Sequence, residues 1–587
     1  EDDQTAVDCE GKEVVGNGGD LLMETLVAAG VNYVFHGSGG GSNRFFDAIV
    51  VRPELKNFLG TNEGQSVAMA DGYHLATGEL GLAIIPKPGL FNAASNIHNA
   101  LAHRSSLFVL TARENNKWSE RRGNIEVIDW EKSMDPMMKW SYRMHQLDRV
   151  PEFASRAIKV ANTPLGGPVF LQMDEDLYES ETTAVIPPQD HFRVNANVRP
   201  DPDRIIEAAR MLIEAEAPLI GVGLEITKAG AQQEIIELAE LLGVPVTQNL
   251  SVHVDFPNQH PLFLGAYNRF LGYTREADLF MLIGAQMPDI GHYIVTGPPP
   301  VNAKTVHISM EPELLANFYP TELSIMANAK AAVSDLIEAV KSLATKERIA
   351  SIKAAREEKM LARIQDARER SILRGRTGWD EAPITFARLS TELDNALEDD
   401  AIVVSEPLFG VPQWFDLGLG KKTMYGPQPG EILGWATASA LGVKLAKPDK
   451  QVVAISGDGA LMFQNNLWAL SRYDAPILTV IYNNRCYNLN RAAAFGGGGR
   501  QAKLGKDIVT YLGNPDVNFA DYARAFKIDA EVVEDPAELA GAIQRGLNAT
   551  KEGKPYLLDV VVKKWGPQPE DTYHPDWSIA EMRTRKI

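Results

Sequence analysis

The chain has 587 residues, of which 45% are hydrophobic and 23% charged, so it can bury several cores and form about three or four domains. Asp and Glu (77) outnumber Lys and Arg (58), and the formal net charge of −19 disfavours binding to nucleic-acid phosphates. The two cysteines, Cys9 and Cys486, are too few for a disulfide framework. No apolar run reaches the ~20 residues that cross a bilayer. A membrane protein, a disulfide scaffold and a nucleic-acid-binding protein are therefore excluded.

One pattern dominates the chain: a short apolar strand, a Gly-containing turn and an amphipathic helix. We expect strands at residues 31–35, 82–85, 107–110, 219–222, 279–283, 452–455 and 477–482. Such alternation is typical of α/β folds in which helices cover parallel sheets. The sequence therefore predicts an α/β protein with three doubly wound parallel-sheet domains.

Two interruptions divide this pattern. Residues 181–202 are rich in Pro and Asn, which is typical of a linker. Residues 343–379 contain a highly charged helical pattern, which indicates a solvated connecting helix. The expected domains span residues 15–180, 203–342 and 380–565, between an acidic tail (1–14) and a polar C-terminal tail (566–587).

The strongest local motif begins where the strand at 452–455 ends. Gly457, Asp458 and Gly459 follow it, and Asn484 comes after a helical stretch and a second strand. Glycines let backbone N–H groups approach phosphate oxygens, and a helix N-terminus favours an anion. The oxygens of Asp458 and Asn484 suit Mg²⁺, which bridges phosphates. The motif predicts a site for a metal-bound diphosphate, whereas a Gly-Asp-Gly sequence alone would indicate only a βα turn.

This motif resembles the thiamin diphosphate motif of the superfamily that contains pyruvate decarboxylase, benzoylformate decarboxylase and acetolactate synthase. The stretch from Leu467 to Asn484 is locally most similar to benzoylformate decarboxylase. The resemblance extends over nearly the whole chain and implies a pyrimidine-binding, a central and a diphosphate-binding domain, in that order. It also implies a set of ligands: Mg²⁺ on Asp458, Asn484 and the carbonyl of Cys486, and thiamin diphosphate against Gly457, Asp458, Gly459, Ala460, Asn484 and Tyr487.

A second match lies in the first domain. Glu63 precedes an Ala-Asp-Gly-Tyr sequence at residues 70–73, which resembles the glutamate of the family and the helix after it. A carboxyl group bonded to the aminopyrimidine ring favours the imino tautomer, which removes the proton from thiazolium C2. The spacing favours this role over that of a carboxylate that only satisfies a helix N-terminus. We therefore expect Glu63 to bind the cofactor and to act as the catalytic acid.

A third match surrounds Leu433. The sequence Glu-Ile-Leu-Gly-Trp at 431–435 resembles the segment that places an aliphatic side chain beneath the cofactor and bends it into its reactive V shape. The resemblance makes Leu433 this wedge and makes the carbonyl of Glu431 the acceptor for the 4′-amino group; the alternative is a core leucine. Looser matches add Gly89 and Asn92 near the pyrimidine and Glu406 in a loop on the diphosphate side.

The sequence departs from the family where substrates are chosen. Ile85, with Lys87 close by, stands where benzoylformate decarboxylase carries a histidine, and the glutamine of acetolactate synthases is absent. Ser42, in a Gly-rich turn that starts at His36, matches the substrate-facing serine of the decarboxylase, and His292 matches its other histidine, slightly displaced. A lone histidine is more often structural than catalytic, so His36 and His292 are candidates only.

Two further Gly-containing segments have alternative interpretations. Residues 496–499 form either a flexible surface loop or, as their position after the metal motif favours, a lid over the substrate channel. Gly221 and Gly223 follow an apolar strand, as in dinucleotide-binding folds, but the third glycine of that fingerprint is missing. We expect a degenerate nucleotide fold that works without a flavin.

These features predict a thiamin-diphosphate- and Mg²⁺-dependent enzyme that breaks or makes a C–C bond next to a carbonyl of a small 2-oxo acid or 2-hydroxyketone. We favour non-oxidative decarboxylation of a 2-oxo acid, with acyloin carboligation as an additional reaction. The alternatives are an acetolactate-synthase-like carboligase or acyloin lyase, a non-catalytic thiamin-diphosphate-binding protein, and an α/β enzyme that binds another phosphate at the Gly-Asp-Gly turn.

Two expectations concern the assembly and its location. In the family, each active site lies between the first domain of one subunit and the third domain of another, which implies a homodimer at minimum and commonly a homotetramer. We expect a cytoplasmic protein, although a chain that does not begin with Met leaves a secreted or periplasmic origin open.

Overall fold

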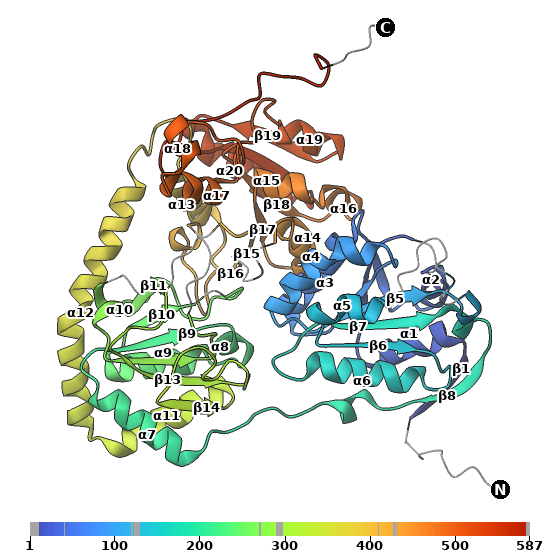
Figure 1. Cartoon of the computed structure of the whole chain (residues 1–587), viewed down its shortest axis with the longest axis horizontal. Helices are drawn as coiled ribbons and strands as arrows, with labels where there is room; N and C mark the ends of the chain where they lie inside the picture. Colours follow the sequence, from blue (N-terminus) through green and yellow to red (C-terminus); the bar gives the residue numbers. More distant parts are fainter. Residues whose placement is uncertain are drawn as a thin grey trace.

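Three six-stranded parallel sheets covered by helices form the protein (Figure 1). The computed structural model describes residues 11–39, 42–118, 121, 129–249, 251–268, 272–288, 297–408, 410–426, 430 and 432–582. The predicted α/β class with three doubly wound parallel-sheet domains is confirmed. None of the helices in these residues combines the length and the apolar character that a membrane span needs.

The first sheet has the strand order β3-β2-β4-β5-β7-β6, with parallel neighbours throughout. Three of its inner strands, β4, β5 and β7, are buried along their whole length, as expected when helices cover both faces. The strands are β2 (Tyr33–His36), β3 (Lys56–Leu59), β4 (Gly81–Ile84), β5 (Leu107–Arg113), β6 (Trp140–Met144) and β7 (Val169–Asp174). The helices are α1 (Gly18–Ala28), α2 (Asn43–Val50), α3 (Glu63–Thr77), α4 (Gly89–Ala102), α5 (Trp130–Met134) and α6 (Val150–Asn162).

The central sheet has the order β11-β10-β9-β12-β13-β14, which is the order of dinucleotide-binding folds, with the switch point between β9 and β12. Its strands are β9 (Pro218–Val222), β10 (Val246–Gln248), β11 (Phe263–Ala266), β12 (Leu279–Ile283), β13 (Lys304–Ser309) and β14 (Leu323–Met326). Its helices are α7 (Pro202–Glu214), α8 (Glu225–Lys228), α9 (Gln232–Leu242), α10 (Gly272–Glu276) and α11 (Ala329–Leu343).

The third sheet, ordered β16-β15-β17-β18-β20-β19, repeats the relative strand order of the first sheet. The first and third units therefore share one topology, although their sequences show no obvious identity. The strands are β15 (Ile402–Ser405), β16 (Thr423–Tyr425), β17 (Val452–Gly457), β18 (Ile477–Asn483), β19 (Asp529–Val533) and β20 (Tyr556–Val561). The helices are α13 (Phe386–Ala396), α14 (Ala436–Ala446), α15 (Asp458–Phe463), α16 (Leu467–Arg472), α17 (Asn488–Gly496), α18 (Arg500–Leu504), α19 (Phe519–Ala525) and α20 (Leu539–Lys551).

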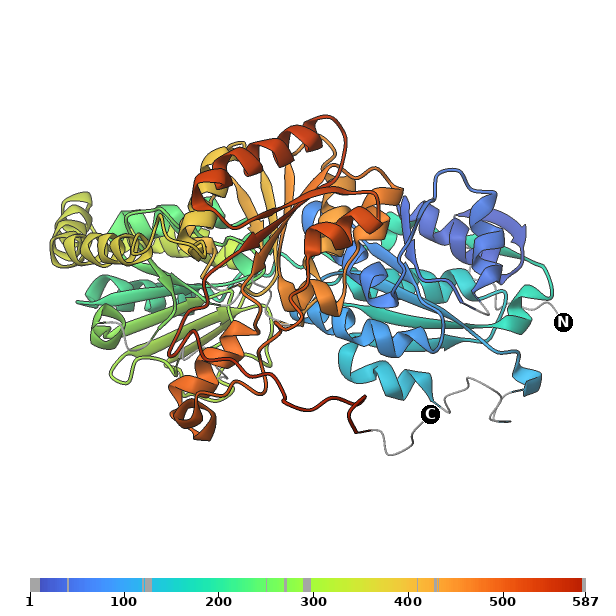
Figure 2. The ribbon, with the colours of Figure 1, turned by 90° about the horizontal axis from the view of Figure 1, so that it is seen from above.

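The segments between the units are more ordered than the sequence pattern indicated. Strand β1 (Lys12–Gly16), partly in the expected tail, pairs antiparallel with β8 (Thr182–Ile186), in the expected linker. Helix α12 (Lys346–Gly375) runs along the outer edge of the central unit, as Figure 2 shows from above. It is not solvated on all sides, because the buried Arg356 donates hydrogen bonds to the carbonyls of Leu212 and Ala215, both at 2.7 Å.

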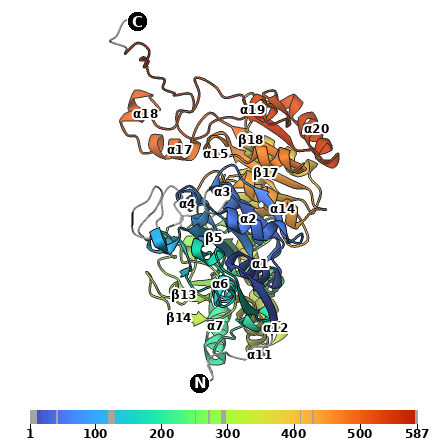
Figure 3. The same ribbon diagram turned by 90° about the vertical axis from the view of Figure 1, so that its right-hand side faces the viewer.

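Helices α3 and α14 join the first and third units (Figure 3). A Cβ atom on Gly72 would lie 2.1 Å from the carbonyl oxygen of Ser439, and one on Gly442 would lie 1.9 Å from that of Met69. Only glycine lets the two backbones approach this closely. Beside this contact, Trp435 Nε1 donates to the buried carboxylate of Asp71 at 2.7 Å. The first and third units of the chain are thus fixed relative to each other by a backbone-to-backbone contact.

We expect Gly442→Ala to loosen this junction. The new methyl group meets backbone rather than a flexible side chain, and such overpacking costs about 1–3 kcal/mol, which corresponds to a thermal midpoint about 2–10 °C lower by calorimetry. Gly541→Ala, at an exposed helical position whose nearest atom is Arg545 Nη1 at 3.3 Å, is the control and should leave the midpoint unchanged or slightly higher. Equal midpoints for both variants would contradict the close helix contact.

Candidate functional site

The Gly-Asp-Gly motif lies at the carboxyl end of β17, next to the carboxyl end of β18. These parallel strands are neighbours, with Gly457 opposite Tyr482, so Asp458 and Asn484 emerge at the same edge of the sheet. The carboxylate of Asp458 accepts hydrogen bonds from the N–H groups of Gly459 at 2.7 Å and of Cys486 at 3.1 Å. Asp458 therefore connects the turn after β17 to the turn after β18.

The oxygens at this edge fit a divalent cation. Asp458 and Asn484 are only 3% and 7% exposed, and Asn484 Oδ1 has no hydrogen-bond partner among the described residues. Burial raises the pKa of Asp458 to about 7, so an isolated carboxylate is unfavourable here and a bound cation would relieve the cost. One carboxylate, one amide oxygen and nearby carbonyls form the all-oxygen set that Mg²⁺ prefers. The described residues contain no group of three or more His, Cys, Asp or Glu that could hold a metal ion.

Cys486 and Tyr487 shape the same turn. Burial raises the pKa of the Cys486 thiol to about 11, so the thiol stays protonated and its backbone, not its sulfur, lies against Asp458. The ring of Tyr487 covers Gly459, and a Cβ atom at that glycine would lie 2.3 Å from the ring. The second glycine of the motif is therefore required by packing.

A cavity of about 980 Å³ opens beside the motif, at the upper end of the size of small-molecule sites. Glu406 also lines it and accepts hydrogen bonds from the backbone N–H groups of Trp435 at 2.8 Å and Ala436 at 2.9 Å. These bonds hold the start of α14, directly after the turn that carries Leu433. Of the predicted residues, the cavity is lined by Glu406, Leu433, Gly457, Asp458, Gly459, Ala460, Asn484, Cys486 and Tyr487.

A second group of predicted residues gathers in the first unit around Glu63. Glu63 is the first residue of α3, and Asn92 Nδ2 donates to its Oε2 at 3.1 Å. A Cβ atom on Gly89 would lie 2.4 Å from the Glu63 carboxylate oxygen Oε1, so the start of α4 can approach the carboxylate only with glycine there. The structure thus brings Glu63, Gly89 and Asn92 together.

The two groups do not share one cavity within the chain. Every described residue that lines the cavity beside Asp458 comes from the third unit or from the end of α12 and the segment that follows it. Glu63 and its neighbours are not among the lining residues. Gly64, next to Glu63, nevertheless packs against Gln464 of the third unit, so Glu63 lies near the third unit but outside the cavity beside Asp458.

The remaining candidates either lie buried in the first unit or fall outside the described residues. Ser42 is fully buried before α2, and His36 packs its ring 4.5 Å from that of Phe46, while burial lowers the pKa of His36 and keeps it neutral. Ile85 belongs to the hydrophobic core, and the buried Lys87 beside it pairs with Glu114 at 3.2 Å. Two predicted residues, His292 and Glu431, lie outside the described part of the chain.

Sequence reasoning missed the polar contacts that lock the first unit to the turns of the third. The fully buried Asn96 donates to the side chain of Gln464 at 3.1 Å, and the fully buried Asn99 donates to the carbonyl of Ile432 at 3.1 Å. Both asparagines lie on α4, one turn apart on an otherwise apolar face. Two asparagines one turn apart in an otherwise apolar core helix are the sequence feature from which these contacts could have been predicted.

Comparisons with known proteins agree with this geometry. Models of the thiamine pyrophosphate enzyme match the chain in order: the N-terminal TPP binding domain at residues 16–134, the central domain at 205–336 and the C-terminal TPP binding domain at 420–560. The chain belongs to the thiamine pyrophosphate enzyme family. The two regions that match cofactor-binding domains contain Glu63 and Asp458. Thiamine pyrophosphate is the same compound as thiamin diphosphate, so the predicted superfamily is confirmed.

The relatives span two activities within this family. A probable acetolactate synthase large subunit of Methanocaldococcus jannaschii is 26% identical over 576 residues, which cover 93% of this chain and 92% of the relative. An acetolactate synthase large subunit of Lactococcus lactis is 24% identical, with 93% of each chain covered. Among solved structures, the 4-hydroxybenzoylformate decarboxylase of Rhodococcus jostii shares the fold with a TM-score of 0.77 at 22% identity, over 93% of this chain and 99% of that one. The benzoylformate decarboxylase of Polynucleobacter necessarius gives 0.76 at 19% identity, over the same shares.

The raised pKa of Asp458 predicts how the metal-free protein responds to pH. The unfolded carboxyl titrates near its ordinary 3.8 and the folded one near 7, so between these values the folded state binds more protons and stability falls as the pH rises. We expect Asp458→Asn, which carries no charge, to melt higher than the wild type at pH 8 without metal, with a smaller difference at pH 5.

Adding Mg²⁺ and thiamin diphosphate should reverse that order, because only the wild type offers the carboxylate. The measurement is the thermal midpoint of both proteins at the two pH values, with and without Mg²⁺ and cofactor. A wild type that gains nothing from the additions, or a variant that gains as much, would show that Asp458 does not hold the metal.

Proposed function

We propose that this protein is a thiamin-diphosphate- and Mg²⁺-dependent enzyme that cleaves or forms a C–C bond next to a carbonyl, acting first as a decarboxylase of a small 2-oxo acid. The observation that carries the proposal is the presence of two separate groups in one chain of this family. One is the set of buried oxygens of Asp458 and Asn484 beside a large cavity. The other is the Glu63 carboxylate, which packs against Gly89 at the start of α4.

The residues of the third unit would bind and orient the cofactor. Asp458, Asn484 and the Cys486 carbonyl would hold Mg²⁺, and through it the diphosphate, while Gly459 leaves room for the backbone to approach. Leu433 faces the same cavity and would support the cofactor from below. When bound, thiamin diphosphate supplies a nucleophilic carbon for the attack on a carbonyl and an electron sink for the electrons of the broken bond.

Glu63 would hold and exchange a proton with the aminopyrimidine ring. Asn92 donates to Oε2, which leaves Oε1 on the side of Gly89 as the oxygen that can bond to the cofactor. General acid–base catalysis requires a carboxyl group that is held in a fixed position and can give up and take back a proton. The glycine at position 89 matters because any side chain there would occupy the space beside that oxygen.

A second copy of the chain would complete the site. None of the described residues that line the cavity beside Asp458 belongs to the first unit, which supports an acid supplied by another subunit. Large apolar side chains flank both groups and are exposed in the single chain: Phe91, next to Asn92, is 56% exposed, and Phe463, at the end of α15, is 55% exposed. Exposed apolar groups at such places are typical of an interface, and we propose a homodimer as the smallest active form.

Carboligation is the second candidate. It is favoured by the acetolactate synthase relatives, which the chain matches along 93% of its length. A cofactor-binding protein without catalysis would need neither Glu63 nor Leu433. An enzyme that uses the Gly-Asp-Gly turn for another phosphate would not need them either.

We expect Glu63→Gln to keep the cofactor but lose turnover by about 10²–10⁴-fold, the usual contribution of a general acid–base group. The direct measurement is the exchange of the cofactor C2 proton for deuterium, followed by proton NMR, which should slow in the variant. Glu54→Gln, a change at an exposed carboxylate of the same unit, is the matched control. Exchange at the wild-type rate in Glu63→Gln would refute the assignment of the acid.

A panel of 2-oxo acids and acyloins separates the two reactions. With Mg²⁺ and thiamin diphosphate present, a decarboxylase releases CO₂ and aldehyde in equal amounts, and we expect this result. CO₂ with acyloin in place of aldehyde would assign the protein to the carboligases instead. Aldehyde from an acyloin without CO₂ would make it a lyase.

A further inference from the structure

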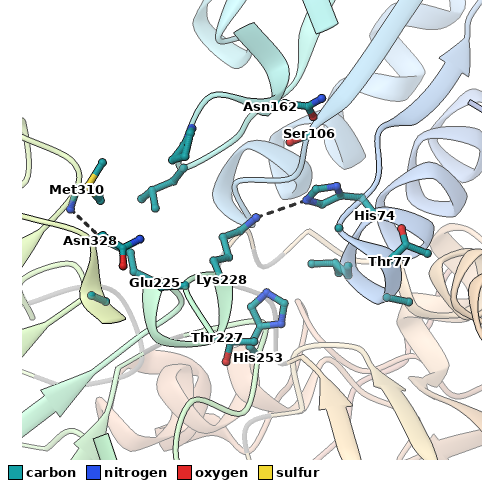
Figure 4. A pocket seen from close by; sticks show the side chains of 17 residues that line it. His74, Thr77, Ser106, Asn162, Glu225, Thr227, Lys228, His253, Met310 and Asn328 are labelled. Carbon is teal, nitrogen blue, oxygen red and sulfur yellow. Dashed lines mark hydrogen bonds between the residues drawn. The ribbon is translucent and has the colours of Figure 1, made fainter. Parts of the chain in front are cut away.

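A second cavity, of about 450 Å³, lies between the first and central units, apart from the site described above (Figure 4). On the central side it is lined by residues that follow β9, β13 and β14, and on the first side by residues at the end of α3 and near Pro164. It lies beyond the carboxyl ends of these strands, the edge at which sheets of this order usually bind ligands. None of the residues assigned to the reaction lines it.

The ammonium group of Lys228 reaches across this junction without a carboxylate partner. It donates to the carbonyl of Arg104, in the first unit, at 2.8 Å. It also lies 3.5 Å from Nε2 of His74, in the same unit, and Figure 4 shows this contact as a dashed line. His74 Nδ1 lies 2.8 Å from the carbonyl of Glu79, so Nδ1 carries the proton and the lone pair of Nε2 faces Lys228. Among the described residues, no carboxylate forms an ion pair with Lys228, and its direct contacts are neutral acceptors, while the buried Asp71 carboxylate acts on it only at longer range.

Two more groups favour negative charge in the same space. His253 is only 8% exposed and lines the cavity, and its Nε2 has no hydrogen-bond partner among the described residues. The 15-residue helix α11 begins there, and its first residue, Ala329, and its N-cap, Asn328, line the cavity with the positive end of the helix dipole.

The one carboxylate that lines the cavity is already bound. Glu225 accepts from Ser309 Oγ at 2.5 Å and from the N–H of Met310 at 2.9 Å, and burial raises its pKa to about 7. The backbone N–H groups of Glu225 and Ile226, which would face the diphosphate in a dinucleotide fold, are bonded to the carbonyls of Gly284 and Gly223. The N–H groups of Lys330 and Ala331 at the start of α11 are bonded to the cap Asn328, so α11 contributes its dipole and the open side-chain donors are those of Lys228 and His253. This set matches a small anion rather than a dinucleotide.

We propose that this cavity binds a small anion through a phosphate or carboxylate group, held by the Lys228 ammonium, His253 Nε2 and the N-terminus of α11. The anion would neutralise the Lys228 ammonium where it meets the first unit, while the groups that hold the anion all belong to the central unit. Binding should therefore stabilise the folded protein without a contact to the first unit. This site is independent of the proposed reaction.

The test uses Lys228 itself as the probe in the wild-type protein loaded with Mg²⁺ and thiamin diphosphate. Burial lowers the pKa of Lys228 to about 8, so near that pH a fraction of the amine is unprotonated and reacts with N-hydroxysuccinimide acetate. The acetylation rate of the Lys228 peptide is followed by mass spectrometry with inorganic phosphate, acetate or chloride at equal ionic strength. The exposed Lys341 on α11, which pairs with Glu237, is the internal control.

We expect phosphate or acetate to slow the acetylation of Lys228 about tenfold when the anion exceeds its dissociation constant about ninefold, with Lys341 unaffected. Protection by one of the two probes identifies the recognised group as phosphate or carboxylate. Unchanged labelling with both probes, or equal protection by chloride, would overturn the proposal.

A variant provides the second measurement. The protecting anion should raise the thermal midpoint of the wild type and of Lys341→Met by the same amount, and should leave that of Lys228→Met unchanged. If Lys228→Met is stabilised as much as the wild type, the anion binds elsewhere and the proposal is wrong. Because the labelling uses the wild type, the test does not depend on how well Lys228→Met folds.

Discussion

The close packing of helices α3 and α14 is the contact on which the arrangement of this molecule depends. Glu63 is the first residue of α3, and α14 starts three residues after Leu433. Glu63 and Leu433 therefore lie at or next to the first turns of two helices whose backbones touch through Gly72 and Gly442. Burial would raise the pKa of Asp71 beside this contact, but His103 and the hydrogen bonds from Ser105 and Trp435 outweigh it and hold the pKa below its ordinary value. A charged group that is bonded on all sides fixes one arrangement, because any sliding of the helices would leave it unpaired.

The proposed cofactor site likewise depends on how a buried carboxylate is compensated. A protein with a net charge of −19 does not attract a diphosphate through its surface. The structure instead concentrates oxygen ligands, backbone amides and glycines at one sheet edge, where a divalent cation and its anionic ligand can neutralise each other. The buried carboxylate of Asp458 is costly when it is charged and unpaired, so a cation bound there would also stabilise the fold. At the cavity around Lys228 the signs are reversed, because no carboxylate among the described residues forms an ion pair with its ammonium group.

The sequence was sufficient for features that depend on local order along the chain. The strand at 279–283 was placed without error, and the Gly-Asp-Gly turn and Asn484 were expected at one sheet edge because consecutive parallel strands end on the same side. Features that depend on contacts between distant segments were not predictable. The pairing of β1 with β8, the burial of Arg356 in a charged helix and the bond from Asn99 to Ile432 join residues that are more than 100 positions apart. The charge of α12 was interpreted as solvation, whereas an arginine can also satisfy the carbonyls at helix ends in a core. That the described lining of the cavity beside Asp458 comes without a first-unit residue was equally unpredictable, since no local pattern reports how two units of one chain face each other.

The central claim is that one working site takes Glu63 from one chain and Asp458 from another. Mixed dimers of Glu63→Gln and Asp458→Asn chains, carrying different tags and purified on both, test it most directly. If the site forms between chains, each mixed dimer contains one site with both substitutions and one intact site, and its activity should recover to about half of the wild-type value per dimer. If each site forms within a chain, every site carries one substitution. Activity as low as that of the two parent variants would then contradict the account.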